Sequence, residues 1–146
     1  LLFSVPRFSW SLKSVAINPK KVYTIDAGFA QANSLSYTKD VGRLFENVIY
    51  LELRRQYKDI YYFREKGECD FIVKDGKKII HIIQVCAEIN TDNIKIEVNG
   101  LVEALDFFNK KEGLIITLNQ DDSILESNKK ITLKSAHNWL KDSKFD

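Results

Sequence analysis

The sequence contains no methionine and only two cysteines, two histidines and two prolines among its 146 residues. Cys69 and Cys86 form no CxxC pair, and His81 and His137 are too scattered to predict a zinc site. Two free thiols without a secretory segment are typical of a reducing cytosol, which predicts a cytoplasmic protein. No run approaches the roughly 18 apolar residues that span a bilayer, so we expect no membrane partner.

The chain also lacks a strong excess of charge of one sign, since its formal net charge is +2. This balance excludes a strongly basic nucleic-acid clamp, while a local basic patch stays compatible with it. Apolar residues make up 45% of the chain and charged residues 29%, as in folded globular domains. The length suits one domain with a core of its own.

The sequence has neither an initiator methionine nor a phosphate-binding loop motif. The chain begins at Leu1, so we expect a piece of a longer protein. It has no GxxxxGK[ST] motif, so any ATP-hydrolysing machinery is expected in a missing part.

Hydrophobic periodicity predicts an α/β domain. Residues 1–39 are predicted to be an irregular leading segment with one short strand at 22–25 and one or two helical turns at 27–34. A helix is predicted from Asp40, a good N-cap, to about Tyr57. Its predicted buried stripe is Val41, Leu44, Phe45, Val48 and Leu51, widened by Ile49 and Leu53 towards Glu46.

The remaining elements are three strands, a helix, and further strands. The strands are predicted at 60–65, 69–74 and 78–88, the last apolar on both faces and therefore central. A helix is expected at 94–110, strands at 113–118 and 131–133, and a terminal helix around Trp139. The order α-β-β-β-α-β predicts a mixed sheet flanked by helices.

Three polar residues interrupt these apolar elements: Glu46 in the first long helix, Asp70 in the second strand and Gln84 in the central strand. Carboxylates from a helix and a strand can hold Mg²⁺ through their oxygen atoms. Such a metal polarises a phosphodiester and lowers the pKa of bound water. A lysine two residues after the acid of the central strand would share its face.

The motifs GRLFE (42–46), ECDFI (68–72) and IQVC (83–86) resemble, in order and spacing, the PD-(D/E)XK nuclease superfamily. The segments NPKKVYTID, GRLFENVIYLELRR, IIQVCAE and KEGLIITL more closely resemble an uncharacterised family that follows AAA+-type ATPase domains in bacteria and archaea. This resemblance spans essentially the whole chain. It implies a restriction-endonuclease-like α/β core at 40–146, with 1–39 linking it to a missing N-terminal ATPase domain, its expected partner.

The resemblance also implies a site. Glu46 corresponds to the helix glutamate and Asp70 to the metal-binding aspartate, Gln84 stands at the second acid and Cys86 at the lysine. Glu46, Asp70 and Gln84 are thus the expected catalytic and Mg²⁺-binding residues. Glutamine brings no charge, and cysteine cannot replace an ammonium group, a type of loss that commonly costs about 100- to 1000-fold in rate.

The resulting hypothesis is a nuclease-like module of an AAA+-type ATPase, with a degenerate Mg²⁺-dependent site, that binds nucleic acid such as DNA or regulates the ATPase. One alternative is an active Mg²⁺-dependent DNA endonuclease, and another is a protein–protein interaction domain. ATP is expected only in the missing domain.

Strand register decides whether these residues can meet. A two-residue turn at Asp75-Gly76 would place Asp70 and Gln84 on opposite faces of the sheet. A three-residue loop, Asp75-Gly76-Lys77, or a bulge would restore one face, and we predict that loop.

Simpler interpretations exist for each site residue. Glu46 is also compatible with a boundary ion pair, Asp70 with a partner at Arg64 or Lys66, and Gln84 with a hydrogen-bonded core amide. Cys86 fits a small buried apolar residue.

Other residues carry weaker signals. Glu88 is either an extra ligand or a solvent-facing residue at a strand end, and His81 is expected to be structural. The basic segments 20–24 and 54–58 suit either phosphate contacts or a solvated helix end, and we favour the latter. Phe3, Phe8 and Trp10 are expected to pack against the missing ATPase portion.

Overall fold

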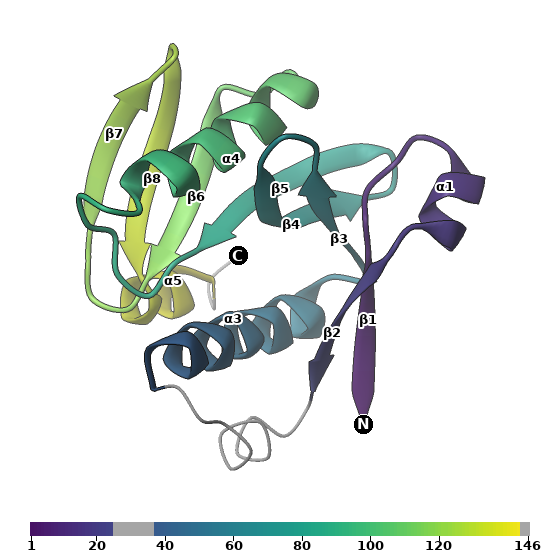
Figure 1. The fold of residues 1–146 in the computed structure, drawn as a ribbon, viewed down its shortest axis with the longest axis horizontal. Helices are drawn as coiled ribbons and strands as arrows, with labels where there is room; N and C mark the ends of the chain where they lie inside the picture. The colour runs from purple at the N-terminus through teal and green to yellow at the C-terminus, as the bar shows by residue number, and fades with distance from the viewer. Residues whose placement is uncertain (25–36, 144–146) are drawn as a thin grey trace.

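The computed structural model describes residues 1–24 and 37–143, which include a mixed six-stranded sheet with helices on both faces (Figure 1). The strand order is β3-β4-β5-β6-β8-β7, with β5, β6 and β8 parallel and the other neighbours antiparallel. The predicted α/β class with a mixed central sheet is confirmed. Its elements are β3 (Asp59–Arg64), β4 (Glu68–Asp75), β5 (Lys78–Val85), β6 (Glu112–Thr117), β7 (Asp122–Glu126), β8 (Lys129–Ser135), α3 (Tyr37–Gln56), α4 (Ile94–Phe107) and α5 (Ala136–Ser143).

The segment before α3 forms an N-terminal arm, residues 2–24, instead of an irregular lead with a single strand. Strands β1 (Leu2–Pro6) and β2 (Lys20–Thr24) pair antiparallel, and the short helix α1 (Leu12–Ile17) connects them. Val5 and Tyr23 are buried in the same apolar cluster as α3, so the arm packs onto the domain. The helical turns predicted at 27–34 lie outside the described residues.

The buried face of α3 is rotated from the predicted stripe. Phe45, Ile49 and Leu53 are buried as expected, but Val48 is 43% exposed. The rotation has a cause in the arm, because the ring of Tyr23 stacks on Tyr50 with centroids 4.4 Å apart. The added contact brings the side of α3 that carries Glu46 against the arm.

The opposite face of the sheet is covered by α4 (Figure 1). Leu101, Ala104 and Leu105 of α4 are fully buried there. Phe8 of the arm is also buried in this cluster, with its ring 4.8 Å from that of Phe108, whereas Trp10 is 69% exposed. Phe8 therefore belongs to the core of this domain.

The β4–β5 hairpin differs from the predicted three-residue loop. Asp75 pairs with Lys78, so the turn holds only Gly76 and Lys77, and Gly76 has a positive φ of 62°. The register then shifts between Val73 and Lys74, which leaves Ile80 as the extra residue of a bulge. The loop prediction was wrong, and the bulge sets the register in which Phe71 pairs with Ile83, the residues next to Asp70 and Gln84.

Two further strand predictions need correction. The first half of β5 is not covered on both faces, since Ile80 is 37% exposed and His81 is exposed. Strand β7 was not predicted; it joins β8 through Ser127 and Asn128, which both have positive φ. Within 1–24 and 37–143, no helix is long and apolar enough to span a membrane.

Candidate functional site

A β-bulge in β4 turns Asp70 out of the regular strand. The pairing of β3 with β4 shifts between Tyr61 and Phe63, so one residue of β3 faces two of β4. Bulges of this kind bend a strand and re-aim a side chain. Phe71 consequently packs on the α3 side, whereas Cys69, two positions earlier, packs on the α4 side. Asp70 lies at this switch, and its carboxylate reaches the arm.

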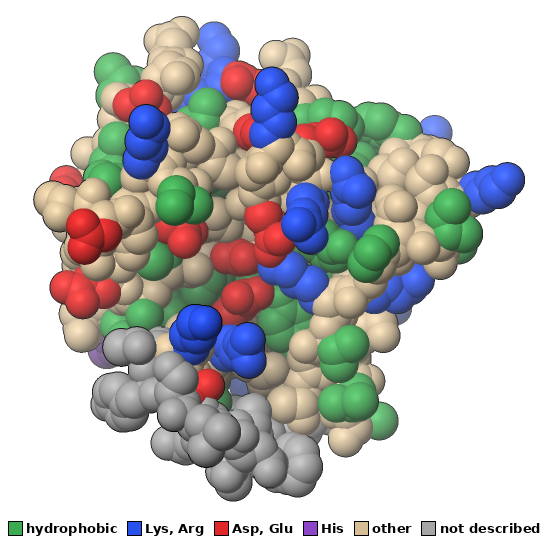
Figure 2. Space-filling view, in the orientation of Figure 1, with side chains coloured by type: hydrophobic (Ala, Val, Ile, Leu, Met, Phe, Trp, Pro, Cys, Tyr) green, Lys and Arg blue, Asp and Glu red, His purple; other side chains and the backbone are tan. Residues whose placement is uncertain are grey.

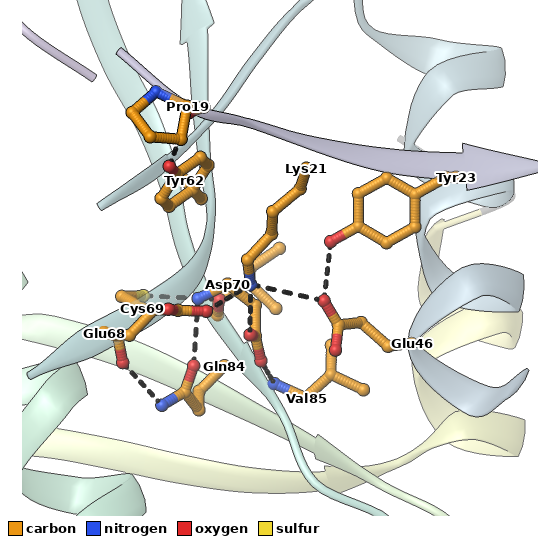
Figure 3. Close-up of polar contacts among 11 residues, drawn as sticks. Pro19, Lys21, Tyr23, Glu46, Tyr62, Glu68, Cys69, Asp70, Gln84 and Val85 are labelled. Atoms are coloured by element: carbon orange, nitrogen blue, oxygen red, sulfur yellow. Dashed lines mark hydrogen bonds and ion pairs between the residues drawn. The ribbon is translucent and has the colours of Figure 1, made fainter. Parts of the chain in front are cut away.

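The carboxylate of Asp70 joins two others around one ammonium group, that of Lys21 in β2 (Figure 3). The Nζ atom of Lys21 lies 3.3 Å from Oδ1 of Asp70 and 3.5 Å from Oε1 of Glu46, and it forms an ion pair with Glu68. These residues come from β2, α3 and β4. The side chain of Lys21 is only 25% exposed, so the pairs are partly shielded from water. We call Lys21, Glu46, Glu68 and Asp70 the Lys21 cluster.

The Glu46 carboxylate is held in place by the arm. The Tyr23 hydroxyl donates a hydrogen bond of 2.5 Å to Oε1 of Glu46. The side-chain amide of Asn47, the next residue of α3, bonds to both the N–H and the C=O of Thr24. Tyr23 and Lys21 lie two residues apart on β2, so both reach the same face. The arm and α3 are thereby fixed relative to each other at the site.

Gln84 lies beside the cluster but does not enter it. Its Oε1 accepts a 2.9 Å hydrogen bond from the main-chain N–H of Asp70, and its Nε2 donates to the carbonyl of Glu68 at 3.0 Å. A longer bond of 3.4 Å reaches the carbonyl of Glu97 in α4. The Gln84 amide thus faces α4 and ties β5 to the main chain of β4, as a satisfied core glutamine does.

Strong electrostatic coupling marks the cluster. Burial, and next the carboxylate of Glu46, raise the pKa of Asp70 to about 8, although Lys21 and the N–H of Val85, which donates to Oδ2 at 2.8 Å, act in the opposite direction. Burial alone would lower the pKa of Lys21, but the surrounding carboxylates together raise it well above its ordinary value. Burial and Glu46 also raise the pKa of Tyr23. Lys21 is therefore charged at neutral pH, and the raised pKa of Asp70 lets its carboxyl group hold a proton near neutrality.

Cys86, at the expected lysine position, is a neutral thiol outside the cluster. Its Sγ lies 3.3 Å from the carbonyl of Glu88 and 3.5 Å from Nδ2 of Asn93. Burial raises the pKa of this thiol to about 11, and the nearby carboxylate of Glu97 contributes. The strand predicted at 78–88 ends at Val85, and the side chain of Glu88 is exposed three residues beyond it.

The expectation of a solvated basic segment at a helix end fits 54–58, whereas 20–24 forms β2 and carries the partly buried Lys21. Arg54 donates to the carbonyl oxygens of Tyr57 and Lys58, as a cation at a helix end does. His81 shares a 2.9 Å hydrogen bond with the hydroxyl of Tyr57. Both side chains thus hold the residues that directly follow α3.

The predicted residues are thus brought together only in part. Glu46 and Asp70 meet, whereas the amide of Gln84 is used by the main chain. In the part of the chain that the structure describes, no group of three or more His, Cys, Asp or Glu side chains is placed to hold a metal. The arrangement fits an ammonium group better than Mg²⁺, which requires near-octahedral oxygen coordination.

Sequence reasoning missed Lys21 and Glu68 as members of the site, and it expected Arg64 or Lys66 as the simple partner of Asp70. A signal for Lys21 was present: Lys21 and Tyr23 alternate on one strand with polar groups towards the same face. Their partners could not be read from it, because Asp70 lies 49 positions further along.

Comparisons with known proteins identify relatives but no activity. Residues 41–136 match a family model described as "Domain of unknown function (DUF4143)". An uncharacterised protein of Methanocaldococcus jannaschii, MJ1544, is 34% identical over 110 residues, which cover 72% of this chain and 24% of that protein. The chain thus spans about a quarter of the length of this relative. No solved structure matches the chain significantly.

Proposed function

The chain belongs to the DUF4143 family, and we propose that it is a nuclease-like C-terminal module of an AAA+-type ATPase that binds nucleic acid without cleaving it. In this proposal the domain works in the cytoplasm and influences the attached ATPase. The archaeal relative supports a place for this domain in a longer polypeptide, since the matched residues cover only 24% of the length of that relative.

A retained scaffold with missing catalytic groups carries the proposal. Glu46 of α3 and Asp70 of β4 meet at one point, as the helix and strand carboxylates of a PD-(D/E)XK site do. A mixed sheet with helices on both faces supports a restriction-endonuclease-like core. At the two remaining motif positions, the Gln84 amide bonds to the main chain and Cys86 is a protonated thiol. Loss of such charged groups commonly costs about 100- to 1000-fold in rate.

The cations that flank the acidic cluster are the feature that supports a phosphate-bearing ligand. Figure 2 shows acidic side chains gathered in the middle of one face, with Lys and Arg side chains on both sides of them. Phosphate backbones bind mainly through such cations, and the affinity falls with salt. Arg43 is an exposed cation of α3 one turn before Glu46, and residues three apart lie on the same side of a helix.

Fluorescence anisotropy with labelled single- and double-stranded DNA tests the proposal, with Arg43→Ala as the variant. Arg55→Ala is the matched control, because Arg55 is an exposed arginine of the same helix, about 18 Å further along its axis. We expect Arg43→Ala to weaken binding and to reduce the salt slope by about 1, and Arg55→Ala to leave both unchanged.

Incubation of the same DNA with Mg²⁺ separates the alternatives. The proposal predicts intact DNA. Cleavage that disappears in Glu46→Ala and Asp70→Ala would establish an active Mg²⁺-dependent endonuclease instead. A complete lack of binding to either DNA would favour a protein–protein interaction domain.

A further inference from the structure

Lys21 is not an ordinary surface lysine. Its main chain is fixed by pairing with Val5, which is 1% exposed, and its neighbours in β2 are locked to α3 through Tyr23 and Asn47. A further anchor is the hydroxyl of Tyr62, which donates a 2.6 Å hydrogen bond to the carbonyl of Pro19, the residue before β2. The ammonium group is therefore delivered to the cluster by a rigid element.

The position of this ammonium group is the centre of the acidic residues. It contacts Glu46, Glu68 and Asp70 at once, and these belong to α3 and β4 (Figure 3). Three buried or half-buried carboxylates without a cation would repel each other strongly. Desolvated carboxylates require either a paired cation or a coordinated metal, and here the side chain of Lys21 meets this need.

We infer that Lys21 is the resident cation of this site and stands where a metal-dependent relative would bind a divalent ion. The ammonium group supplies the positive charge to Glu46 and Asp70, so the chain holds its helix, strand and arm together without a metal. This role accounts for the neutral groups at Gln84 and Cys86, because a site with an internal cation gains nothing from ligands for an external one. Lys21 is thus a positioning residue that sets the cation preference of the site.

The inference predicts a latent divalent-cation site beneath Lys21. With Lys21 between them, the carboxylates of Glu46, Glu68 and Asp70 are not placed to hold a metal. Removal of the ammonium group frees them to close around a divalent ion, and oxygen-rich anionic groups bind Mn²⁺ and Mg²⁺. A divalent ion interacts with these carboxylates about twice as strongly as a monovalent one at the same distance. Lys21→Ala should therefore acquire an affinity that the wild type lacks.

The test is thermal unfolding and calorimetric titration of Lys21→Ala with MnCl₂, compared with wild type and Lys20→Ala. Lys20 is the matched control, because it is the adjacent lysine of β2 but bonds to the carbonyl of Ala16. We expect Mn²⁺ to raise the melting temperature of Lys21→Ala and to bind it at least about tenfold more tightly than wild type. The gain should vanish in Lys21→Ala/Asp70→Asn and should be absent from Lys21→Arg, which keeps the positive charge.

Each other result overturns the inference. Equal binding of Mn²⁺ by wild type and Lys21→Ala would show that Lys21 does not hold the cation position. No gain in Lys21→Ala would show that the carboxylates do not form a cation site. If Lys21→Ala is unfolded without metal, Mn²⁺ must restore its circular dichroism spectrum, and failure to do so counts against the inference.

The inference rests on the proposed nuclease-like origin of the site, yet the two can fail separately. DNA binding by the wild type is measured without Mn²⁺, so its loss would remove the proposed function and leave the cation result standing. Conversely, a wild-type protein that binds both DNA and Mn²⁺ would retain the proposed function and remove the inference.

Discussion

Gly100 lies where α4 comes close to the main chain of β4, and its replacement by alanine should destabilise the protein strongly. An added Cβ atom would lie 2.3 Å from the carbonyl oxygen of Glu68 and 3.3 Å from Nε2 of Gln84. The first distance is far below a van der Waals contact, and the obstructing atom is main chain, which cannot rotate away. The helix and the strand must therefore separate, or the strand must bend where it carries the site.

The size of the effect follows from two opposing contributions. Alanine favours the helix over glycine by about 1 kcal/mol. Overpacking of a core costs typically about 1–3 kcal/mol and occasionally more. The same displacement stretches the hydrogen bond from Gln84 to Glu68, and a buried acceptor left without a partner costs about 1–3 kcal/mol. We expect a net loss of about 2–4 kcal/mol in the free energy of unfolding.

Urea denaturation followed by circular dichroism measures this loss, with Gly42→Ala as the matched control. Gly42 also lies inside a long helix, but apart from its chain neighbours and the adjacent main chain of that helix, no described atom is within 4 Å of its added Cβ. Gly42→Ala should leave stability unchanged or raise it by up to about 1 kcal/mol. If Gly100→Ala is as stable as Gly42→Ala, the close approach of α4 to β4 is refuted.

Three other changes test the site and the core. Gln84→Leu removes both amide hydrogen bonds to the main chain of β4 and should cost about 2–4 kcal/mol in urea denaturation; an unchanged midpoint would contradict the bridging role. The raised pKa of Asp70 means that the folded state binds this proton more tightly than the unfolded state, so the contribution of Asp70 to stability should fall as pH rises from about 4 to about 8. Asp70→Asn should flatten that slope in urea titrations at pH 5, 7 and 9, and a parallel slope would disprove the assignment. Phe8→Ala should cost about 3–5 kcal/mol, because its ring is buried in the core. Trp10→Ala, at an exposed ring, should cost less than about 1 kcal/mol, and equal losses would contradict the described packing.

Hydrophobic periodicity correctly predicted the helices and strands that bury their apolar residues within the sheet or directly against it. The helix predicted at 94–110 begins where α4 does and runs three residues past its end at Phe107, and the apolar strands predicted at 69–74 and 113–118 match β4 and β6 closely. Strand β7 was missed because its residues are mostly exposed and its turn uses Ser127 and Asn128, whereas two-residue hairpin turns more often carry glycine.

Tertiary contacts decided what the pattern could not. The predicted buried stripe of α3 took only the sheet as its cover and therefore included Val48, which is exposed. The arm also packs on α3 through the ring of Tyr23, and this contact rotates the buried face of the helix. The meeting of Glu46 and Asp70 followed from the resemblance. Their cation did not, because Lys21 reaches them only through the docking of the arm. The bulges on both sides of β4, which decide where Asp70 points, leave no mark in its alternation of apolar and polar residues.

The most direct test of the resident cation is a crystal structure of the wild-type protein grown in Mn²⁺, with anomalous diffraction recorded at the manganese edge. Our account predicts no anomalous peak between Glu46 and Asp70, and the Nζ atom of Lys21 within hydrogen-bonding or ion-pair distance of both carboxylates. A manganese peak coordinated by these two carboxylates, with Lys21 turned away, would contradict it.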